Sequence, residues 1–209
     1  MRLLHEYVKL MLEDRSVGSE AVVVRGLEAV VYDVEEMRSL IEDEPRVVVP
    51  VGGYMHPPAK VSGQMLDFVV RGYVGLRKPD EPCEGAYEVA GIAGEGGTLY
   101  RLAYALSPSG LLVSDRHEDM SPDAVSAWKR MAAEGKRGRH ALNPDECSLS
   151  QHEFLNYAYE VEPGDVELLK AMQAAHESFL SGLPRGVDRG KFENGLMSAG
   201  KMYFGSSIR

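Results

Sequence analysis

A cluster of glycines, Gly94-Glu95-Gly96-Gly97, separates a strand-like run at residues 86–92 from an amphipathic run at residues 98–106. A short apolar run at 111–114 follows, and the order strand, turn, helix, strand predicts an α/β domain. Free backbone N–H groups at the start of such a helix suit a phosphate or pyrophosphate. The alternative is that the glycines only make a tight connection between strand and helix and bind no phosphate. The turn lacks the Lys and Ser/Thr of a P-loop and the full spacing of a dinucleotide fingerprint.

Strands and helices are predicted along most of the remaining chain. The predicted strands are 21–25, 28–32, 46–51, 65–76, 86–92, 111–114 and 155–161, and the predicted helices are 34–44, 98–106, 122–134 and 165–180. Helix 122–134 has the clearest boundaries, with Ser121 as N-cap, Pro122 in the first turn and Gly135 as stop. Ser121 is therefore interpreted as a helix cap and not as a nucleophile.

The two ends of the chain are predicted to be appendages of a domain at residues 20–181. Residues 1–14 place apolar side chains at helical spacing, and a loop at 15–20 separates this amphipathic helix from the domain. From Gly182 onward, glycines recur at short intervals among a few apolar residues. Residues 182–209 are therefore expected to form a loose arm outside the core.

The composition is that of a folded globular chain, since 44% of the 209 residues are hydrophobic and 26% are charged. A net charge of −9 excludes a broad basic face for non-specific nucleic-acid binding. Residues 33–44 are dense in acids, and the one basic cluster consists of Lys129, Arg130, Lys136, Arg137 and Arg139. This cluster predicts either a local contact with nucleic acid or an acidic subunit, or a solvated helix end.

Neither a membrane span nor a secretion signal is expected, so the sequence predicts a soluble, cytoplasmic protein without a membrane partner. No apolar run approaches the ~18 residues that a span needs. His5, Glu6 and Lys9 interrupt what would have to be the apolar part of a signal peptide.

Cys83 and Cys147, separated by 63 residues, are the only cysteines. They are not expected to make a disulfide framework, and they predict a reducing compartment. His140, Asp145, Cys147 and His152 are metal-ligand types, but their spacing matches no strong zinc pattern, so no metal is predicted. The alternative is that either cysteine, paired with a histidine, is a catalytic nucleophile. The sequence shows no adjacent group that would lower the pKa of the thiol.

Segment 83–128 resembles the central, cofactor-binding half of GNAT-type N-acyltransferases, with a strand, glycine turn, helix, short strand and second helix in the same order. In that family the turn usually reads Arg/Gln-x-x-Gly-x-Gly/Ala, and its backbone amides hold the pyrophosphate of acetyl-CoA. Gly94 and Gly96 match the glycines, while Gly91 stands at the basic or amide position. The resemblance implies a mixed twisted sheet with flanking helices and cofactor contacts at Gly94, Gly96, Gly97 and Thr98.

Residues 83–160 also resemble a set of uncharacterised tailed-phage proteins with a GNAT-like core. The shared pattern is Asp115-Arg116, a Ser and a Trp-bearing helix, then Asp145-Glu146-Cys147 and Leu155-Asn156-Tyr157. Residues 1–13 resemble the amphipathic leader of phage virion proteins, which in some is a capsid-targeting peptide cut after Glu. The alternative is an ordinary helix packed on the domain. The resemblance implies virion proteins or further copies of this chain as partners, and a location in the host cytoplasm and then in the virion.

Asp115-Arg116-His117 lies between a predicted strand and the capped helix. One interpretation makes Asp115 a base or orienter and Arg116 an anion clamp, and the other pairs Arg116 with Asp115 or Asp119 to fix the turn.

The sequence predicts two alternative functions for the protein. The first is a phage virion-associated protein with a degenerate GNAT-like core, held by its termini. The alternative is an N-acyltransferase using acetyl-CoA or another acyl-CoA, with Asp115 or an upstream Glu as base and Tyr100 or Tyr104 near the leaving thiol.

Overall fold

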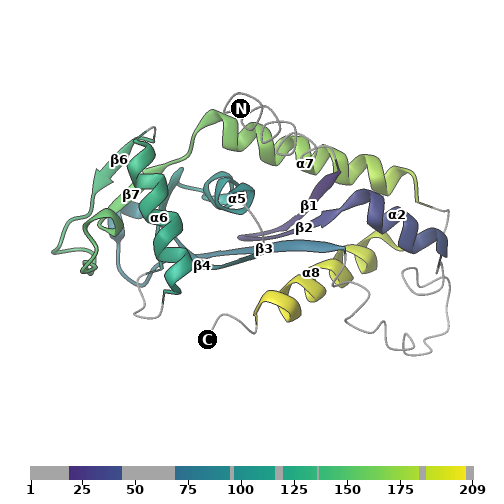
Figure 1. Ribbon diagram of the computed structural model, residues 1–209, viewed down its shortest axis with the longest axis horizontal. Helices are drawn as coiled ribbons and strands as arrows, with labels where there is room; N and C mark the ends of the chain where they lie inside the picture. Colours follow the sequence, from purple (N-terminus) through teal and green to yellow (C-terminus); the bar gives the residue numbers. More distant parts are fainter. Residues whose placement is uncertain are drawn as a thin grey trace, which may run out of the picture.

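A seven-stranded mixed sheet forms the centre of the protein in the computed structural model (Figure 1). The structure describes residues 19–43, 69–94, 97–115, 120–135, 137–183 and 187–205. The strands are Glu20–Arg25 (β1), Glu28–Asp33 (β2), Val70–Arg77 (β3), Tyr87–Gly94 (β4), Leu111–Val113 (β5), Arg139–Ala141 (β6) and Tyr157–Glu160 (β7). Their order is β1-β2-β3-β4-β5-β7-β6, and every neighbouring pair is antiparallel except β4 and β5. The predicted α/β class is confirmed.

The helices lie on both faces of this sheet. They are Val34–Asp43 (α2), Thr98–Leu106 (α5), Pro122–Glu134 (α6), Pro163–Ser181 (α7) and Arg189–Gly205 (α8), with short 3-10 turns at Cys83–Gly85 (η1) and Glu153–Leu155 (η2). Helix α6 has the predicted caps: Ser121 Oγ accepts from the Ala124 N–H at 3.2 Å, and Gly135 is left-handed at φ 62°. Strand 46–51 and helix 1–14 were predicted for residues outside the described part of the chain.

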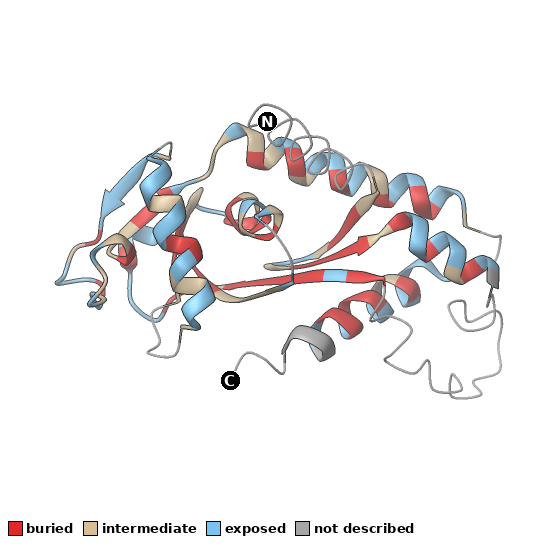
Figure 2. Ribbon diagram, viewed as in Figure 1, coloured by how far each residue is buried: buried red, intermediate tan, exposed pale blue. Residues whose placement is uncertain are grey.

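Alternation along the long strands separates two hydrophobic cores, one on each face. In β1, Val22 faces the core formed with α5, α6 and the first half of α7. Its neighbours Ala21 and Val23 face the opposite core, which α2, α8 and the end of α7 complete. Figure 2 shows the buried sides of these helices turned toward the sheet. None of the described helices is long and apolar enough to cross a membrane.

The expectation of a loose C-terminal arm is wrong for residues 189–205, because α8 belongs to the second core. Phe192, Leu196 and Ala199 recur at helical spacing and are buried against β2 and β3. Gly200 meets β2 so closely that a Cβ there would lie 2.5 Å from Val30 Cγ2. The glycines that suggested a flexible arm weaken an isolated helix, but close packing on the sheet compensates for that loss.

A buried hydrogen-bonded chain also fixes α8. His176 of α7 contacts the Tyr32 hydroxyl through Nδ1 at 2.8 Å and Glu193 of α8 through Nε2 at 3.2 Å. Tyr32 and His176 are buried, while Glu193 is partly exposed. Burial, reinforced by the charge of Glu193, raises the pKa of the Tyr32 hydroxyl, which therefore stays protonated. This chain links β2, α7 and α8 through polar contacts that the hydrophobic pattern does not reveal.

The cysteine prediction is also wrong, because Cys83 and Cys147 form a disulfide with a Cα–Cα distance of 4.8 Å. Both cysteines belong to one hydrophobic cluster with residues of β5 and β7, because the β3–β4 connection and the long connection between β6 and β7 meet over these strands. We call the latter, residues 142–156, the β6–β7 loop. Separation along the sequence gives no information about this proximity, which comes from the way the two connections fold over the sheet.

Candidate functional site

The parallel strands β4 and β5 part soon after they meet. They pair only at Tyr87 with Leu112 and at Glu88 with Val113, and β5 then ends while β4 continues to Gly94 along β3. Ligands of open α/β sheets bind in the crevice outside the carboxyl ends of such strands, where neighbouring connections lead apart. The parting of β4 and β5 is therefore the candidate site.

Of the two described glycines of the turn, Gly94 leaves no room for a side chain, whereas Gly97 does. Gly94 is left-handed at φ 128°, and a Cβ there would lie 2.4 Å from the Arg71 carbonyl oxygen, so close approach of β3 explains this glycine. Gly97 is exposed, precedes α5 as its N-cap, and would place a Cβ within 4 Å of nothing. No side chain of the described residues caps α5, and no acidic residue lies in its first turn. Gly97 and Thr98 thus begin a helix whose end suits an anion, whereas Gly96 lies outside the described residues.

A charged cluster marks the point where β4 and β5 separate. Arg77 of β3 donates to both carboxylate oxygens of Glu88, at 2.9 and 3.2 Å, and to Asp115 at 3.1 Å. The hydrogen bonds to Glu88 raise the pKa of the Arg77 guanidinium, which stays charged. The side chain of Glu88 is 3% exposed and that of Asp115 is 31% exposed. Asp115 is therefore the more accessible carboxylate.

Sequence reasoning named Asp115 and an unspecified upstream Glu, and it missed Arg77. The predicted partner of Asp115 was Arg116, but Arg116, His117 and Asp119 lie outside the described residues. Among the described residues, Asp115 pairs with Arg77, a residue on a different strand. The available signal was a single acid, Glu88, in the otherwise apolar run 86–92, because a buried charge needs a partner.

Tyr104 lies in the helix-packed core, and Tyr100 packs against it. Both rings meet Trp128 edge-on, at centroid distances of 5.9 and 6.4 Å. Tyr104 is fully buried, and its hydroxyl has no hydrogen-bond partner among the described residues. Burial raises the pKa of both phenols. Tyr100 is only partly buried, so it is the tyrosine closer to solvent.

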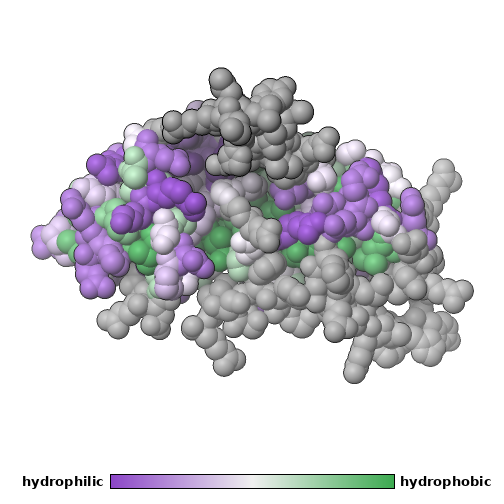
Figure 3. Space-filling model, viewed as in Figure 1, coloured by the Kyte–Doolittle hydropathy of each residue, from purple (hydrophilic) through white to green (hydrophobic). Residues whose placement is uncertain are grey.

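Within the predicted basic cluster, two arginines make contacts inside the protein and two residues of α6 are exposed to solvent. Arg137 donates to both carboxylate oxygens of the buried Asp165, and its guanidinium lies 3.9 Å from the Tyr104 ring centroid. Arg139 stacks on Tyr157 at 4.6 Å. Lys129 and Arg130 are exposed on α6, in a region whose surface is largely hydrophilic (Figure 3), and Lys136 is outside the described residues.

The four predicted metal-ligand types do not converge. His140 pairs with Glu160 at 2.7 Å, His152 stacks on Phe154, and Cys147 is in the disulfide. Within the described ranges, the one group of three ligand types close together is Glu81, Cys83 and Cys147. Because its two sulfurs are bonded to each other, neither is available as a thiolate ligand or as a catalytic nucleophile in this state.

Comparisons with known proteins found no counterpart. No family model matches the chain, no curated protein matches it, and no solved structure matches its fold.

Proposed function

We propose that this protein binds an acyl-CoA at the parting of β4 and β5 and transfers the acyl group to an amine, with a core of the GNAT type. The observation that carries the proposal is the early separation of the parallel strands beside a helix start that no described side chain caps. The succession of β4, glycine turn, α5, β5 and α6 follows the segment order of the family that the sequence resembles. In this proposal the N–H groups of Gly97 and Thr98 bind the pyrophosphate.

Asp115 is the proposed base. The amine nitrogen attacks the thioester carbonyl carbon, its proton moves to the Asp115 carboxylate, the carbon–sulfur bond breaks, and CoA leaves as the thiolate. Arg77 donates to Asp115 at 3.1 Å and orients its carboxylate. Glu88, almost fully buried, fixes Arg77 through two hydrogen bonds. Tyr100 remains a candidate donor to the leaving thiolate.

Calorimetric titration with acetyl-CoA tests the binding step, using Gly97→Glu and the uncharged Gly97→Gln as a matched pair. Neither side chain clashes at its Cβ, and a carboxylate at a helix N-terminus stabilises the helix. We expect Gly97→Glu to weaken binding more than about tenfold by repelling the pyrophosphate, while Gly97→Gln changes it much less. No saturable binding to the unaltered protein, or equal binding by both variants, would contradict the proposal.

The virion-associated function stays a prediction. It was based on the leader-like pattern of residues 1–13, a loose arm at residues 182–209, the departure of the glycine turn from the family pattern and the resemblance of residues 83–160 to phage proteins. Residues 189–205 of that arm are part of the core, and residues 1–13 lie outside the described chain. Mass spectrometry of purified virions, comparing the full chain with one lacking residues 1–14, tests it: loss of incorporation with intact folding is the expected result.

A further inference from the structure

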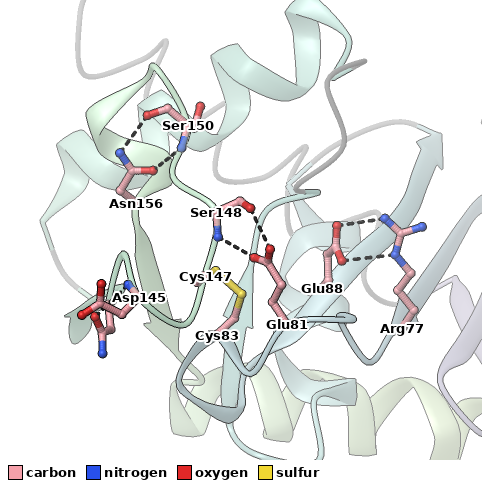
Figure 4. Close-up of a disulfide and its surroundings, with 10 residues drawn as sticks. Arg77, Glu81, Cys83, Glu88, Asp145, Cys147, Ser148, Ser150 and Asn156 are labelled. Atoms are coloured by element: carbon pink, nitrogen blue, oxygen red, sulfur yellow. Dashed lines mark hydrogen bonds and ion pairs between the residues drawn. A yellow bond between two sulfur atoms is a disulfide. The ribbon is translucent and has the colours of Figure 1, made fainter.

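The disulfide joins two connections that are far apart in sequence. Cys83 lies in the β3–β4 connection and Cys147 in the β6–β7 loop, 64 positions later. The loop is closed at its base where the Leu142 N–H donates to the Asn156 carbonyl at 3.0 Å. Figure 4 shows the bridge together with the neighbouring contact between Ser148 and Glu81.

The first part of this loop, residues 142–150, covers one end of a sheet face, beyond the described helices that pack on that face. The hydrophobic cluster beneath it contains residues of β5, β7, η1 and the two connections, and no residue of an α-helix: Cys83, Ala86, Val113, Leu142, Cys147 and Ala158. The members other than the cysteines are two alanines, a valine and a leucine. The disulfide therefore supplies a large share of the contact that holds the loop on the sheet.

Hydrogen bonds also join the loop to the β3–β4 connection, and those between Ser148 and Glu81 are exposed. Ser148 donates to Glu81 through its backbone N–H and its hydroxyl, and the Cys83 N–H donates to the Glu146 carbonyl at a long 3.5 Å. Exposed hydrogen bonds contribute little net stability because water replaces them readily. Without the disulfide, the loop is the part of this end expected to open first.

The same cluster borders the Arg77 site. Ala86 and Val113 precede Glu88 and Asp115 by two positions, and residues two apart in an extended chain point to the same side of the sheet. Figure 4 shows the Arg77–Glu88 pair next to the bridge. Opening of the loop therefore removes packing from the two segments that carry these carboxylates.

We propose that the Cys83–Cys147 disulfide is a redox-sensitive latch, which in its oxidised form holds the β6–β7 loop over the sheet and in its reduced form releases it. A dithiol reductant opens the latch: one thiolate displaces a cysteine sulfur to give a mixed disulfide. The second thiol then closes the reductant into a cyclic disulfide and frees the other cysteine. Two electrons and two protons pass to the protein, which gains two thiols. Only the effect on acyl-CoA binding rests on the proposed function.

Hydrogen–deuterium exchange of the full chain before and after reduction with dithiothreitol tests the latch. Reduction is expected to speed exchange in residues 142–150 by roughly 100-fold, since losing a native disulfide shifts an opening equilibrium by about that factor. Exchange at 86–88 and 111–115 should rise with it, while β1 and β2 stay unchanged and reoxidation restores the slow rates. The double variant Cys83→Ala, Cys147→Ala should behave like the reduced protein.

Ser148→Ala is the matched control, because it removes a hydrogen bond to Glu81 and leaves the bridge intact. It should exchange slowly when oxidised and respond to reduction as the unaltered protein does. Unchanged exchange after reduction would overturn the latch. An equal increase in exchange throughout the chain would also overturn it, because the disulfide would then stabilise the whole protein and not the loop alone. Acetyl-CoA binding by the oxidised protein, measured alongside, separates failure of the latch from failure of the proposed function.

Discussion

The two ends of the sheet are stabilised in different ways. At the helix-covered end, β1, β2 and β3 have six to eight residues each and pack between α5 and the first half of α7 on one face and α2, α8 and the end of α7 on the other. At the stapled end, β5, β6 and β7 have three or four residues, and a loop with a disulfide replaces a helix on one face. Long strands with helical cover gain stability from apolar burial, whereas short strands here depend on a covalent link.

A single core deletion at each end should therefore have unequal effects. Leu196→Ala in α8 should lower the free energy of unfolding by about 2–5 kcal/mol, because the helix and sheet around it cannot close the cavity. Leu142→Ala in the oxidised protein should cost less, about 1–2 kcal/mol, because the β6–β7 loop can settle into the space. Urea unfolding measures both.

Leu149→Ala serves as the reference for these two deletions. Leu149 is 50% exposed, so its loss should change the free energy of unfolding by no more than about 0.5 kcal/mol. If Leu142→Ala proved as costly as Leu196→Ala, the stapled end would be as tightly packed as the helix-covered end, and the comparison would fail.

Asp165 connects the two ends, since it binds Arg137 just before β6 and Arg101 of α5. Burial alone would raise the pKa of Asp165, but hydrogen bonds from Arg137, the Glu162 backbone and Arg101 lower it below its ordinary value. Asp165→Asn should cost about 3 kcal/mol at neutral pH, because it leaves Arg137 largely buried without its charged partner.

The loss of stability caused by Asp165→Asn should depend on pH in a definite direction. A carboxyl with a lowered folded-state pKa contributes stability that is present above its unfolded pKa of about 3.9 and is lost as pH falls through the folded value. The difference in unfolding free energy between the unaltered protein and Asp165→Asn should therefore shrink below about pH 4. Asp123→Asn, in the exposed first turn of α6, should cost less than about 1 kcal/mol. A difference independent of pH would contradict the ion-pair assignment.

Two glycines of α8 give the smallest and most selective test of the helix-covered end. Gly200→Ala should destabilise by about 1–3 kcal/mol, because its Cβ would collide with Val30. Gly195→Ala should stabilise by about 0.5–1 kcal/mol, since its Cβ meets nothing and alanine is the better helix former. Thermal unfolding of the pair checks both. Stabilisation by both substitutions would show that α8 does not pack closely on β2.

Elements with local sequence signals could be predicted from the sequence, whereas contacts between distant segments could not. The β-rich runs at residues 21–25 and 28–32 and the caps of α6 are local signals, and the elements they predicted are present. Strand β6 was not predicted, because three exposed residues carry no pattern, and α8 was hidden by its glycines. The disulfide depends on the way two connections fold over the sheet and the Arg77 cluster on the order of its strands, and no local pattern contains either.

In the proposed function, an acyl-CoA binds where β4 and β5 part, at the start of α5. Backbone amide NMR spectra recorded during titration with acetyl-CoA test this binding. We expect saturable shifts that are largest at the amides of Gly97, Thr98 and Leu99, with smaller changes near Asp115. Saturable shifts confined to another part of the chain, or none at all, would contradict it.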